Sequence, residues 1–359
     1  MWKEQPTIMD KQGLIYRPKI TIAGPCSAES REQLLSTARS LAAMGRVDIL
    51  RAGVWKPRTS PNSFEGAGDV ALEWLSEAKR ITELPIATEV ANAHHAKKAL
   101  EAGVDVAWIG ARTTNNPFSV QEIAEALGGS SVEVLVKNPT SADVELWVGA
   151  VERLEKCGVK NIGLIHRGFS GYNSVGGYRN APLWGLALEM RRRMPQMPMI
   201  CDPSHICGNR SGLLSVAQQA ADLDYSGVMI ECHPAPEEAL SDAEQQITPK
   251  ELSDLLAQIV WKSNSSDSAL CKSELERLRG TIDRLDDEIF ALIARRMEIS
   301  DQIGELKRNN NLTILQSGRW QEVVEKVTLR AEELGLGRDF TTKILDAIHL
   351  ESIERQKEK

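Results

Sequence analysis

The sequence lacks the features of membrane proteins, disulfide-rich secreted proteins and general nucleic-acid binders. It has no run of about 18 apolar residues, and residues 1–13 lack the apolar core of a signal peptide. Six cysteines in 359 residues are too few for a disulfide scaffold. Acidic residues outnumber basic ones by 50 to 43, so there is no general positive charge for nucleic acid. These absences predict a cytoplasmic protein that binds neither membranes nor nucleic acids.

The composition is that of a folded protein with a substantial core. Hydrophobic residues make up 42% of the chain and charged residues 26%, which excludes wholesale disorder. A length of 359 residues favours two domains, or one large barrel with a smaller unit attached. The sequence shows no internal repeat beyond an alternation of strand and helix patterns.

Short β-branched runs alternate with amphipathic segments from residue 19 to residue 260. Eight strands are predicted, at Ile20–Ala23, Val47–Ala52, Ile86–Val90, Val106–Ile109, Val132–Val136, Asn161–Ile165, Met199–Cys201 and Gly227–Glu231. Helices are predicted between them, at Arg31–Met44, Ala71–Thr82, His94–Ala102, Ser119–Leu127, Ala142–Cys157, Pro182–Arg193 and Gly212–Leu223, and the last barrel helix is expected to end at Trp261. Eight strand–helix units favour an α/β fold of the (β/α)₈ TIM-barrel type over a doubly wound open sheet.

The pattern changes after the barrel. Residues 262–270 are polar and rich in serine, which is typical of a linker. Residues 271–309 contain no proline and predict one long helix, and two further helices are expected at about Gly318–Leu334 and Arg338–Lys357. We therefore predict a barrel domain at 1–261, a linker at 262–270 and an all-α three-helix domain at 271–359.

Basic residues recur just after the predicted strands. In barrels of this kind the chemistry gathers at the carboxyl ends of the strands. Each cation alone could be a solvated surface charge, but cations clustered on one rim repel one another unless an anion neutralises them. The set indicates more than one anionic group, such as two phosphorylated substrates; its members are Arg51, Lys56, Arg58, Arg112, Lys137 and Arg167.

A second group of residues has the chemistry of metal ligands. Cys26 follows the first strand, His205 follows the seventh, and Glu231 and Asp242 follow the eighth. Closing a barrel places the eighth strand beside the first, so these four side chains can meet at one rim. A mixed sulfur, nitrogen and oxygen set suits a divalent ion such as Mn, Fe, Co or Zn. Taken alone, Cys26 could equally be an ordinary core residue.

Seven ordered motifs within residues 19–260 resemble 3-deoxy-D-arabino-heptulosonate 7-phosphate (DAHP) synthase, in its short form without an appended N-terminal regulatory domain. They are Gly24-Pro-Cys-Ser, Lys56-Pro-Arg-Thr-Ser-Pro, Gly110-Ala-Arg-Thr-Thr, Lys137-Asn-Pro, His166-Arg-Gly, Asp202-Pro-Ser-His and the stretch from Glu231 to Asp242. The resemblance implies that Cys26, His205, Glu231 and Asp242 bind the metal. It implies phosphoenolpyruvate binding by Arg51, Lys56, Arg112, Lys137 and Arg167, and erythrose 4-phosphate binding by Lys56, Pro57, Arg58 and Thr59. His166 and Asp202 are also expected to contact substrate.

The reaction implied by this resemblance joins two anionic molecules. C3 of phosphoenolpyruvate attacks the aldehyde of erythrose 4-phosphate, and water attacks C2 before phosphate leaves. Lys56 and Lys137 are expected to be catalytic, and either Lys137 or a metal-linked water moves the protons. The alternative is the sister barrel, 3-deoxy-D-manno-octulosonate 8-phosphate synthase, which uses a pentose phosphate. That family carries a Lys-Ala-Asn-Arg-Ser type motif, whereas residues 56–59 here read Lys-Pro-Arg-Thr.

The long C-terminal helix carries an apolar heptad seam interrupted by a charge. Arg296 occupies a seam position, and Lys307 lies about 20° away on the same face. Arg279 lies about 100° from that face and is expected to serve something else. A charged residue in such a seam could instead fix the register of a coiled coil. The seam itself consists of Leu275, Leu278, Ile282, Leu285, Ile289, Leu292, Ile299, Ile303 and Leu306.

The same residues resemble the all-helical chorismate mutase, over residues 271–359. The resemblance implies one site formed by Arg296, Lys307, Arg319, Ser352 and Gln356, with Arg279 entering the site of a partner chain. Arg296, Lys307 and Gln356 would be catalytic. A homodimer through this domain, or a larger assembly, is expected because three helices cannot complete the site alone. Together the two resemblances predict a bifunctional shikimate-pathway enzyme acting on phosphoenolpyruvate, erythrose 4-phosphate and chorismate.

Two further expectations concern how the tail acts. In the alternative interpretation, the tail is only a dimerisation or effector-sensing module without activity of its own. Tethering a domain that binds a late pathway intermediate also predicts that prephenate or chorismate inhibits the barrel.

Overall fold

The computed structural model describes residues 12–56, 62–171, 177–263 and 268–358. The chain divides into two compact units, Met1–Asn264 and Ser265–Lys359. Among the described residues, every helix is too short or too polar to cross a membrane.

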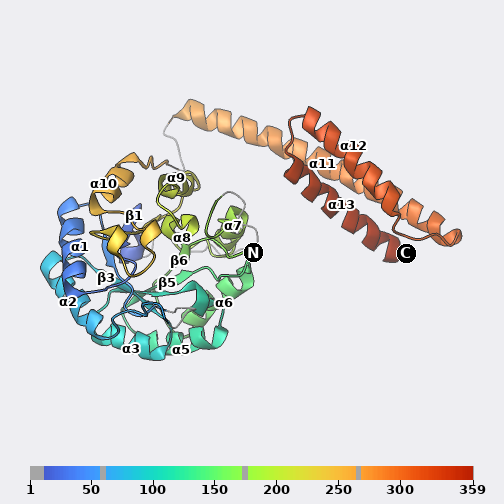
Figure 1. Cartoon of the computed structure of the whole chain (residues 1–359). Coiled ribbons are helices and arrows are strands. Elements are labelled where there is room, and N and C mark those ends of the chain that lie inside the picture. Colours follow the sequence, from blue (N-terminus) through green and yellow to red (C-terminus); the bar gives the residue numbers. More distant parts are fainter. Residues whose placement is uncertain (1–11, 57–61, 172–176, 264–267, 359) are drawn as a thin grey trace. The chain divides into compact units, whose positions relative to one another are not determined.

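The first unit contains a closed parallel barrel of eight strands in sequence order (Figure 1). Strand β8 pairs with β1 along its whole length, so that Gly24 lies opposite Glu231. The predicted TIM barrel is therefore confirmed, and the open sheet is wrong. The strands are β1 (Ile20–Gly24), β2 (Ile49–Arg51), β3 (Ile86–Val90), β4 (Val106–Ile109), β5 (Glu133–Lys137), β6 (Ile162–His166), β7 (Met199–Cys201) and β8 (Gly227–Glu231).

Helices surround the strands on the outside of the barrel (Figure 1). Their starts follow capping chemistry: the Ser30 side chain accepts from Gln33 N at the start of α1, and Thr248 and Glu251 form a capping box in α10. The last helix ends at Gln258 rather than at Trp261, because the backbone becomes extended at Ile259. The helices are α1 (Arg31–Met44), α2 (Val70–Thr82), α3 (Ala93–Glu101), α4 (Ala111–Thr114), α5 (Pro117–Leu127), α6 (Val144–Lys156), α7 (Trp184–Arg193), α8 (Pro203–Cys207), α9 (Leu213–Asp222) and α10 (Pro249–Gln258).

Strand residues alternate between two buried clusters, as the period of two in a strand requires. One cluster joins the strands to the surrounding helices. The other fills the barrel interior, and it consists of Ile20, Ile22, Ile49, Ala87, Val106, Trp108, Leu135, Ile165, Ile200 and Met229, with Ile15 and Tyr16. The register of this inner cluster determines which residues at the strand ends point into the barrel.

The amino end of the barrel is closed by the short helix η2 (Leu14–Tyr16). Glu133, the first residue of β5, accepts from Leu14 N at 2.7 Å and from Ile15 N at 2.9 Å. Tyr16 Oη donates to the carbonyl of Ile162 at the start of β6. Ile15 is fully buried beneath the inner cluster. Polar access to the interior is therefore from the carboxyl end.

The second unit consists of three helices, α11 (Ala269–Asn309), α12 (Ser317–Glu333) and α13 (Arg338–Glu358). Helix α13 packs against the second half of α11, where Met297, Ser300, Asp301 and Gly304 are buried. The predicted all-α three-helix arrangement is confirmed. The first half of α11 leaves its apolar seam exposed in the single chain, including Leu278, Ile282, Leu285 and Ile289.

Candidate functional site

The carboxyl ends of the strands point a set of charged side chains into the barrel. Arg51, Glu89 and Glu231 each lie two residues after a member of the inner cluster, and they therefore share its inward direction. Lys137 follows the same rule after Leu135. The predicted gathering of charge at this rim thus follows from the pleat of the strands.

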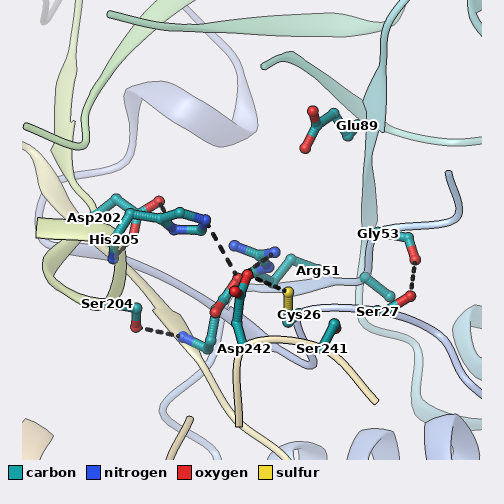
Figure 2. A network of polar contacts seen from close by, with 12 residues as sticks. Cys26, Ser27, Arg51, Gly53, Glu89, Asp202, Ser204, His205, Ser241 and Asp242 are labelled. Atoms are coloured by element: carbon teal, nitrogen blue, oxygen red, sulfur yellow. Dashed lines mark hydrogen bonds and ion pairs between the residues drawn. The ribbon is translucent and has the colours of Figure 1, made fainter. Parts of the chain in front are cut away.

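Three of the four predicted metal ligands lie together. Cys26 Sγ, a carboxylate oxygen of Glu231 and one of Asp242 are all within 4.8 Å of one another. The Cys26 thiol donates to Asp242 Oδ2 at 3.2 Å, which Figure 2 shows beside Arg51. The pairing of β8 with β1 explains why residues more than 200 positions apart meet here. The loop after β8 returns to the strand end through His233 N, which donates to the Ile247 carbonyl, and so places Asp242 at the rim.

His205 lies at the edge of this group. Its Nε2 is 3.8 Å from Glu231 Oε1, and its Nδ1 is 2.8 Å from Asp202 Oδ2. Asp202 caps α8 by accepting from His205 N, so the residue that orients the ring also begins its helix. Burial lowers the pKa of His205 and favours the neutral imidazole, the form that binds metals.

Positive charges surround the carboxylates of this group. Arg51 Nη2 donates to Glu231 Oε1 at 3.1 Å. Burial raises the pKa of Asp242, but its neighbours His205, Arg179 and Lys56 together outweigh burial and hold this pKa below its ordinary value.

The pKa of the Cys26 thiol is shifted upward, in contrast to that of Asp242. Burial, reinforced by Glu231, raises the pKa of Cys26 to about 12. Lys56 Nζ lies 3.1 Å from Cys26 Sγ and donates to the Cys26 carbonyl at 2.9 Å. A cation already stands beside the sulfur, where a bound metal would also favour the thiolate.

A cavity of about 460 Å³ opens beside these residues. Its walls include Lys56, Arg112, Lys137 and Arg167 of the predicted cationic set. Lys137 Nζ donates to Asp202 Oδ2 at 2.8 Å. Burial lowers the pKa of Arg167 to about 10. The volume and the lining suit a small molecule that carries several negative charges.

Arg51 lies deeper than the other cations and is fully buried. Its Nε and Nη1 have no hydrogen-bond partner among the described residues, although its Nη2 binds Glu231. Its guanidinium carbon lies 4.8 Å from the centre of the Trp108 ring. Because unpaired buried N–H groups are costly, this arrangement is typical of an anion site.

The prediction that His166 contacts substrate needs correction. Ile165 belongs to the inner cluster, so the next side chain points outward, and the His166 ring lies against Trp184 and Tyr225. Its Nε2 donates to the Pro182 carbonyl at 2.6 Å, and its Nδ1 accepts from Tyr225 Oη at 2.9 Å. Both ring nitrogens are therefore occupied by protein groups outside the cavity.

Four other residues were predicted to bind substrate, namely Pro57, Arg58, Thr59 and Asp202. Pro57, Arg58 and Thr59 lie outside the described residues. The carboxylate of Asp202 is fully buried and holds Lys137, so this residue positions a cation rather than facing an anion.

Three polar residues at this rim lie outside the predicted site. Glu89 lines the cavity and accepts from Trp108 Nε1 at 3.0 Å. Arg179 also lines the cavity, and Gln245 is buried against Glu231. The strand alternation could have found Glu89 from the inward position of Ala87. No comparable signal marks Arg179 and Gln245, because neither residue directly follows a strand.

In the helical unit, four of the predicted residues lie together. Arg296 Nη1 donates to Ser352 Oγ at 2.6 Å. Lys307 Nζ donates to Gln356 Oε1 at 3.3 Å, and Gln356 Nε2 donates to Ser300 Oγ at 2.9 Å. The contact between α11 and α13 therefore gathers two cations and two polar side chains on one face.

The other two predicted residues of this unit lie elsewhere in the single chain. Arg319 is exposed at the start of α12 and pairs with Glu322 at 2.9 Å. Arg279 is exposed on the first half of α11, seventeen residues before Arg296 in the same helix. Neither has a described hydrogen bond to Arg296, Lys307, Ser352 or Gln356.

Two family models match successive parts of the chain. Residues 16–267 match the family model of the DAHP synthetase I family, and residues 278–357 match chorismate mutase type II. A phospho-2-dehydro-3-deoxyheptonate aldolase from Thermotoga maritima is 34% identical over 226 residues, which are 63% of this chain and 64% of that protein's length. A 2-dehydro-3-deoxyphosphooctonate aldolase from Methylobacterium radiotolerans is 28% identical over 264 residues, 68% of this chain and 89% of that protein.

Solved structures show the same relationship. The crystal structure of the Thermotoga maritima DAHP synthase superposes with a TM-score of 0.60 at 30% identity, covering 67% of this chain and 68% of that one. A truncated form of the Thermotoga enzyme gives a TM-score of 0.57 at 28% identity, covering 67% and 84%. With residues 16–267 of 359 inside one family model, this chain belongs to the DAHP synthetase I family and carries a C-terminal chorismate mutase type II domain.

Proposed function

We propose that this protein is a cytoplasmic, bifunctional shikimate-pathway enzyme. The barrel domain, which we place at residues 1–261, condenses phosphoenolpyruvate with erythrose 4-phosphate and water to give DAHP and phosphate. The helical domain at 271–359, joined by a linker at 262–270, rearranges chorismate to prephenate. The observation that carries the first activity is the sulfur–oxygen cluster of Cys26, Glu231 and Asp242 beside a cavity lined by arginine and lysine.

The donor set fits a divalent transition metal. Cys26, Glu231 and Asp242 would hold the ion, and a small movement of the His205 ring adds its Nε2. Thiolate, imidazole and carboxylate together suit Mn, Fe, Co or Zn. When bound, such an ion supplies Lewis acidity at the aldehyde oxygen.

The cations of the barrel position two molecules that repel each other. Arg51 would offer its unpaired N–H groups to the anion bound deepest, and Lys137 is held in place by Asp202. Arg167 and Arg112 line the same cavity as Lys137. C3 of phosphoenolpyruvate then bonds to the aldehyde carbon, water adds to C2, and the C2–oxygen bond to phosphate breaks. The protein's contribution is to hold both anions in reacting geometry.

A coupled assay tests this proposal. Phosphate release from phosphoenolpyruvate should require both erythrose 4-phosphate and a divalent metal. Cys26→Ala should abolish it, whereas Cys157→Ala should not, because Cys157 lies outside the ligand cluster. Full turnover by Cys26→Ala in a chelator-treated assay would contradict the ligand assignment.

A pentose phosphate is the second candidate for the aldehyde substrate. The Methylobacterium relative is named a 2-dehydro-3-deoxyphosphooctonate aldolase, at 28% identity. The Lys-Pro-Arg-Thr sequence at residues 56–59 favours the four-carbon aldehyde. Parallel assays with erythrose 4-phosphate and arabinose 5-phosphate distinguish the two, and a higher kcat/KM for the pentose phosphate would reverse the assignment.

For the mutase, the group of Arg296, Lys307, Ser352 and Gln356 supports the proposal. Its cations would bind the carboxylates of chorismate, and Lys307 with Gln356 would stabilise the ether oxygen as its bond breaks. Arg296→Ala should abolish chorismate loss, whereas Arg295→Ala, one position away on another face, should not. Absence of chorismate loss by the wild-type protein would favour the alternative, a tail that serves only dimerisation or effector sensing. Activity retained in Arg296→Ala would contradict the assignment of Arg296 to the site.

We further propose that the helical unit forms a homodimer. The exposed seam on the first half of α11 offers the apolar surface, and Arg279 lies on the same stretch, from which it would enter the partner's site.

Because this unit binds a late intermediate, prephenate or chorismate should inhibit the barrel. Condensation rates that do not change at saturating prephenate would refute this regulation.

A further inference from the structure

We infer that Gln245 and Arg179 form a hydrogen-bonded bridge that sets the orientation of the two carboxylate ligands, Glu231 and Asp242. This inference rests on the proposed metal dependence and extends it to two residues outside the ligand set. Both are positioning residues, because they would act on the ion through the carboxylates. The bridge runs from Glu231 through Gln245 and Arg179 to Asp242.

The first half of the bridge is the contact between Gln245 and Glu231. Gln245 Nε2 donates to Glu231 Oε2 at 2.6 Å, and both side chains are buried. Gln245 lies in η4 (Ala243–Gln245), directly after Asp242, so a short helical turn ties the two carboxylate positions together. The next residue, Gln246, accepts from Cys26 N at 2.9 Å. The turn that follows Asp242, with the residue after it, therefore contacts two of the other candidate ligands, Glu231 and Cys26.

The second half of the bridge is the guanidinium of Arg179. Its Nη1 donates to Gln245 Oε1 at 2.8 Å and to Asp242 Oδ1 at 3.1 Å. The Gln245 amide thus has its oxygen on Arg179 and its nitrogen on Glu231, which fixes the direction of the amide. A single arginine nitrogen joins the glutamine to the second carboxylate.

The backbone around Arg179 is anchored to the helix that carries His205. Arg179 N donates to the Cys207 carbonyl, and Asn180 Nδ2 donates to the His205 carbonyl at 2.6 Å. The arginine side chain crosses Gly208, where an added Cβ would lie 2.4 Å from Arg179 Cβ. Arg179 is therefore placed against α8 before its guanidinium reaches Asp242.

The bridge leaves one oxygen of each carboxylate directed at the ligand cluster. Glu231 uses Oε2 for Gln245, and its Oε1 faces Arg51 and His205. Asp242 uses Oδ1 for Arg179, and its Oδ2 accepts from Cys26. Hydrogen bonds to the outer oxygens of ligating carboxylates orient these groups, and losing such partners typically weakens metal binding by about 10- to 100-fold.

The test measures Co²⁺ binding to the full-length protein, because Co²⁺ reports both affinity and thiolate ligation in its absorption spectrum. We expect Arg179→Met and Gln245→Met each to weaken Co²⁺ binding by about 10-fold or more in competition with a chelating dye. Their Co²⁺ spectra should differ from that of the wild type because the coordination geometry changes. Arg179→Lys, which keeps a donor and the charge, should recover part of the affinity.

The Co²⁺ affinity of a double variant distinguishes a bridge from two independent contacts. If they act as a unit, the double variant Arg179→Met/Gln245→Met should lose little more affinity than the weaker-binding single variant. Fully additive losses in the double variant would overturn the bridge.

Arg210 provides the matched control. Its guanidinium holds the same loop by donating to the Gln246 and Ala243 carbonyls, without a described contact to Glu231 or Asp242 side chains. Arg210→Met should change Co²⁺ affinity less than about 3-fold, well below the effect expected for the bridge. The bridge would be overturned if Arg210→Met lost as much Co²⁺ affinity as the bridge variants, or if Arg179→Met and Gln245→Met kept the wild-type Co²⁺ affinity. Either result would leave the proposed metal site unaffected. A wild-type protein that binds no Co²⁺ would overturn the proposed function, and the bridge with it.

Discussion

The buried His166 ring predicts a loss of stability in mild acid. Its surroundings suit the neutral ring, since Nε2 donates to the Pro182 carbonyl, Nδ1 accepts from Tyr225 and the ring is fully buried. Burial lowers the pKa of His166 from 6.5 to about 4. A histidine in the unfolded chain keeps its ordinary pKa. Between the two pKa values the unfolded chain binds a proton that the folded protein excludes, so stability falls as the pH falls.

The size of the effect follows from the two pKa values. Above pH 7.5 the ring is neutral in both states and contributes no pH dependence. Each pKa unit corresponds to 1.36 kcal/mol, so the full difference amounts to about 3 kcal/mol once the pH has fallen below 4. By pH 5 about 2 kcal/mol of this should already be lost.

Urea unfolding of the wild type and of His166→Gln, at pH 7.5 and at pH 5, measures this term. The glutamine amide can replace the hydrogen bond to the Pro182 carbonyl but does not titrate. The wild type should be more stable at pH 7.5 and lose about 2 kcal/mol of this advantage by pH 5. His94→Gln is the control, because its ring is 65% exposed. If the unfolding free energies of wild type and His166→Gln fall in parallel, the assignment to His166 is wrong.

Three further outcomes are expected. Gly24→Ala should destabilise the barrel by about 2 kcal/mol or more in a thermal melt, because Gly24 has φ +151° and the new Cβ would lie 2.0 Å from the Arg51 carbonyl oxygen; an equal shift in Gly149→Ala, where the helix surface is open, would contradict this reason. A chelator should stop phosphate release but leave chorismate loss unchanged in the same sample, and loss of both activities would contradict separate sites. Ile282→Asp should shift the protein toward a monomer in size-exclusion chromatography, whereas Arg284→Asp should not; an unchanged dimer in Ile282→Asp would exclude this seam.

Much of the barrel could be predicted because strand signals are local. Hydrophobic runs placed all eight strands near their observed positions, and the closed barrel follows from their number and alternation. The end of the last helix was missed because Ile259 continues the apolar pattern after the backbone has become extended. Periodicity reports which side chains are apolar, whereas the end of a helix depends on backbone hydrogen bonds.

The candidate site was predictable where residues follow a strand directly. Side chains alternate in direction along a strand, and this rule gives the inward direction of Arg51, Lys137 and Glu231. The same rule would have excluded His166, because Ile165 already points inward. Arg179 lies beyond the end of β6, in the connection to α7, and reaches Asp242 only because its backbone docks on α8. Such contacts depend on the path of a loop in three dimensions, which spacing in the sequence does not encode.

Among the described residues, the closed amino end of the barrel leaves the carboxyl end as the way into the site. With η2 closing the amino end, a molecule that paired with Arg51 would enter and leave at the carboxyl end, where Arg112 lines the cavity. A second molecule bound nearer the carboxyl end would then block the exit of the first molecule. We therefore expect a fixed order of binding, in which the molecule beside Arg51 binds first and leaves only after the second molecule has reacted or left.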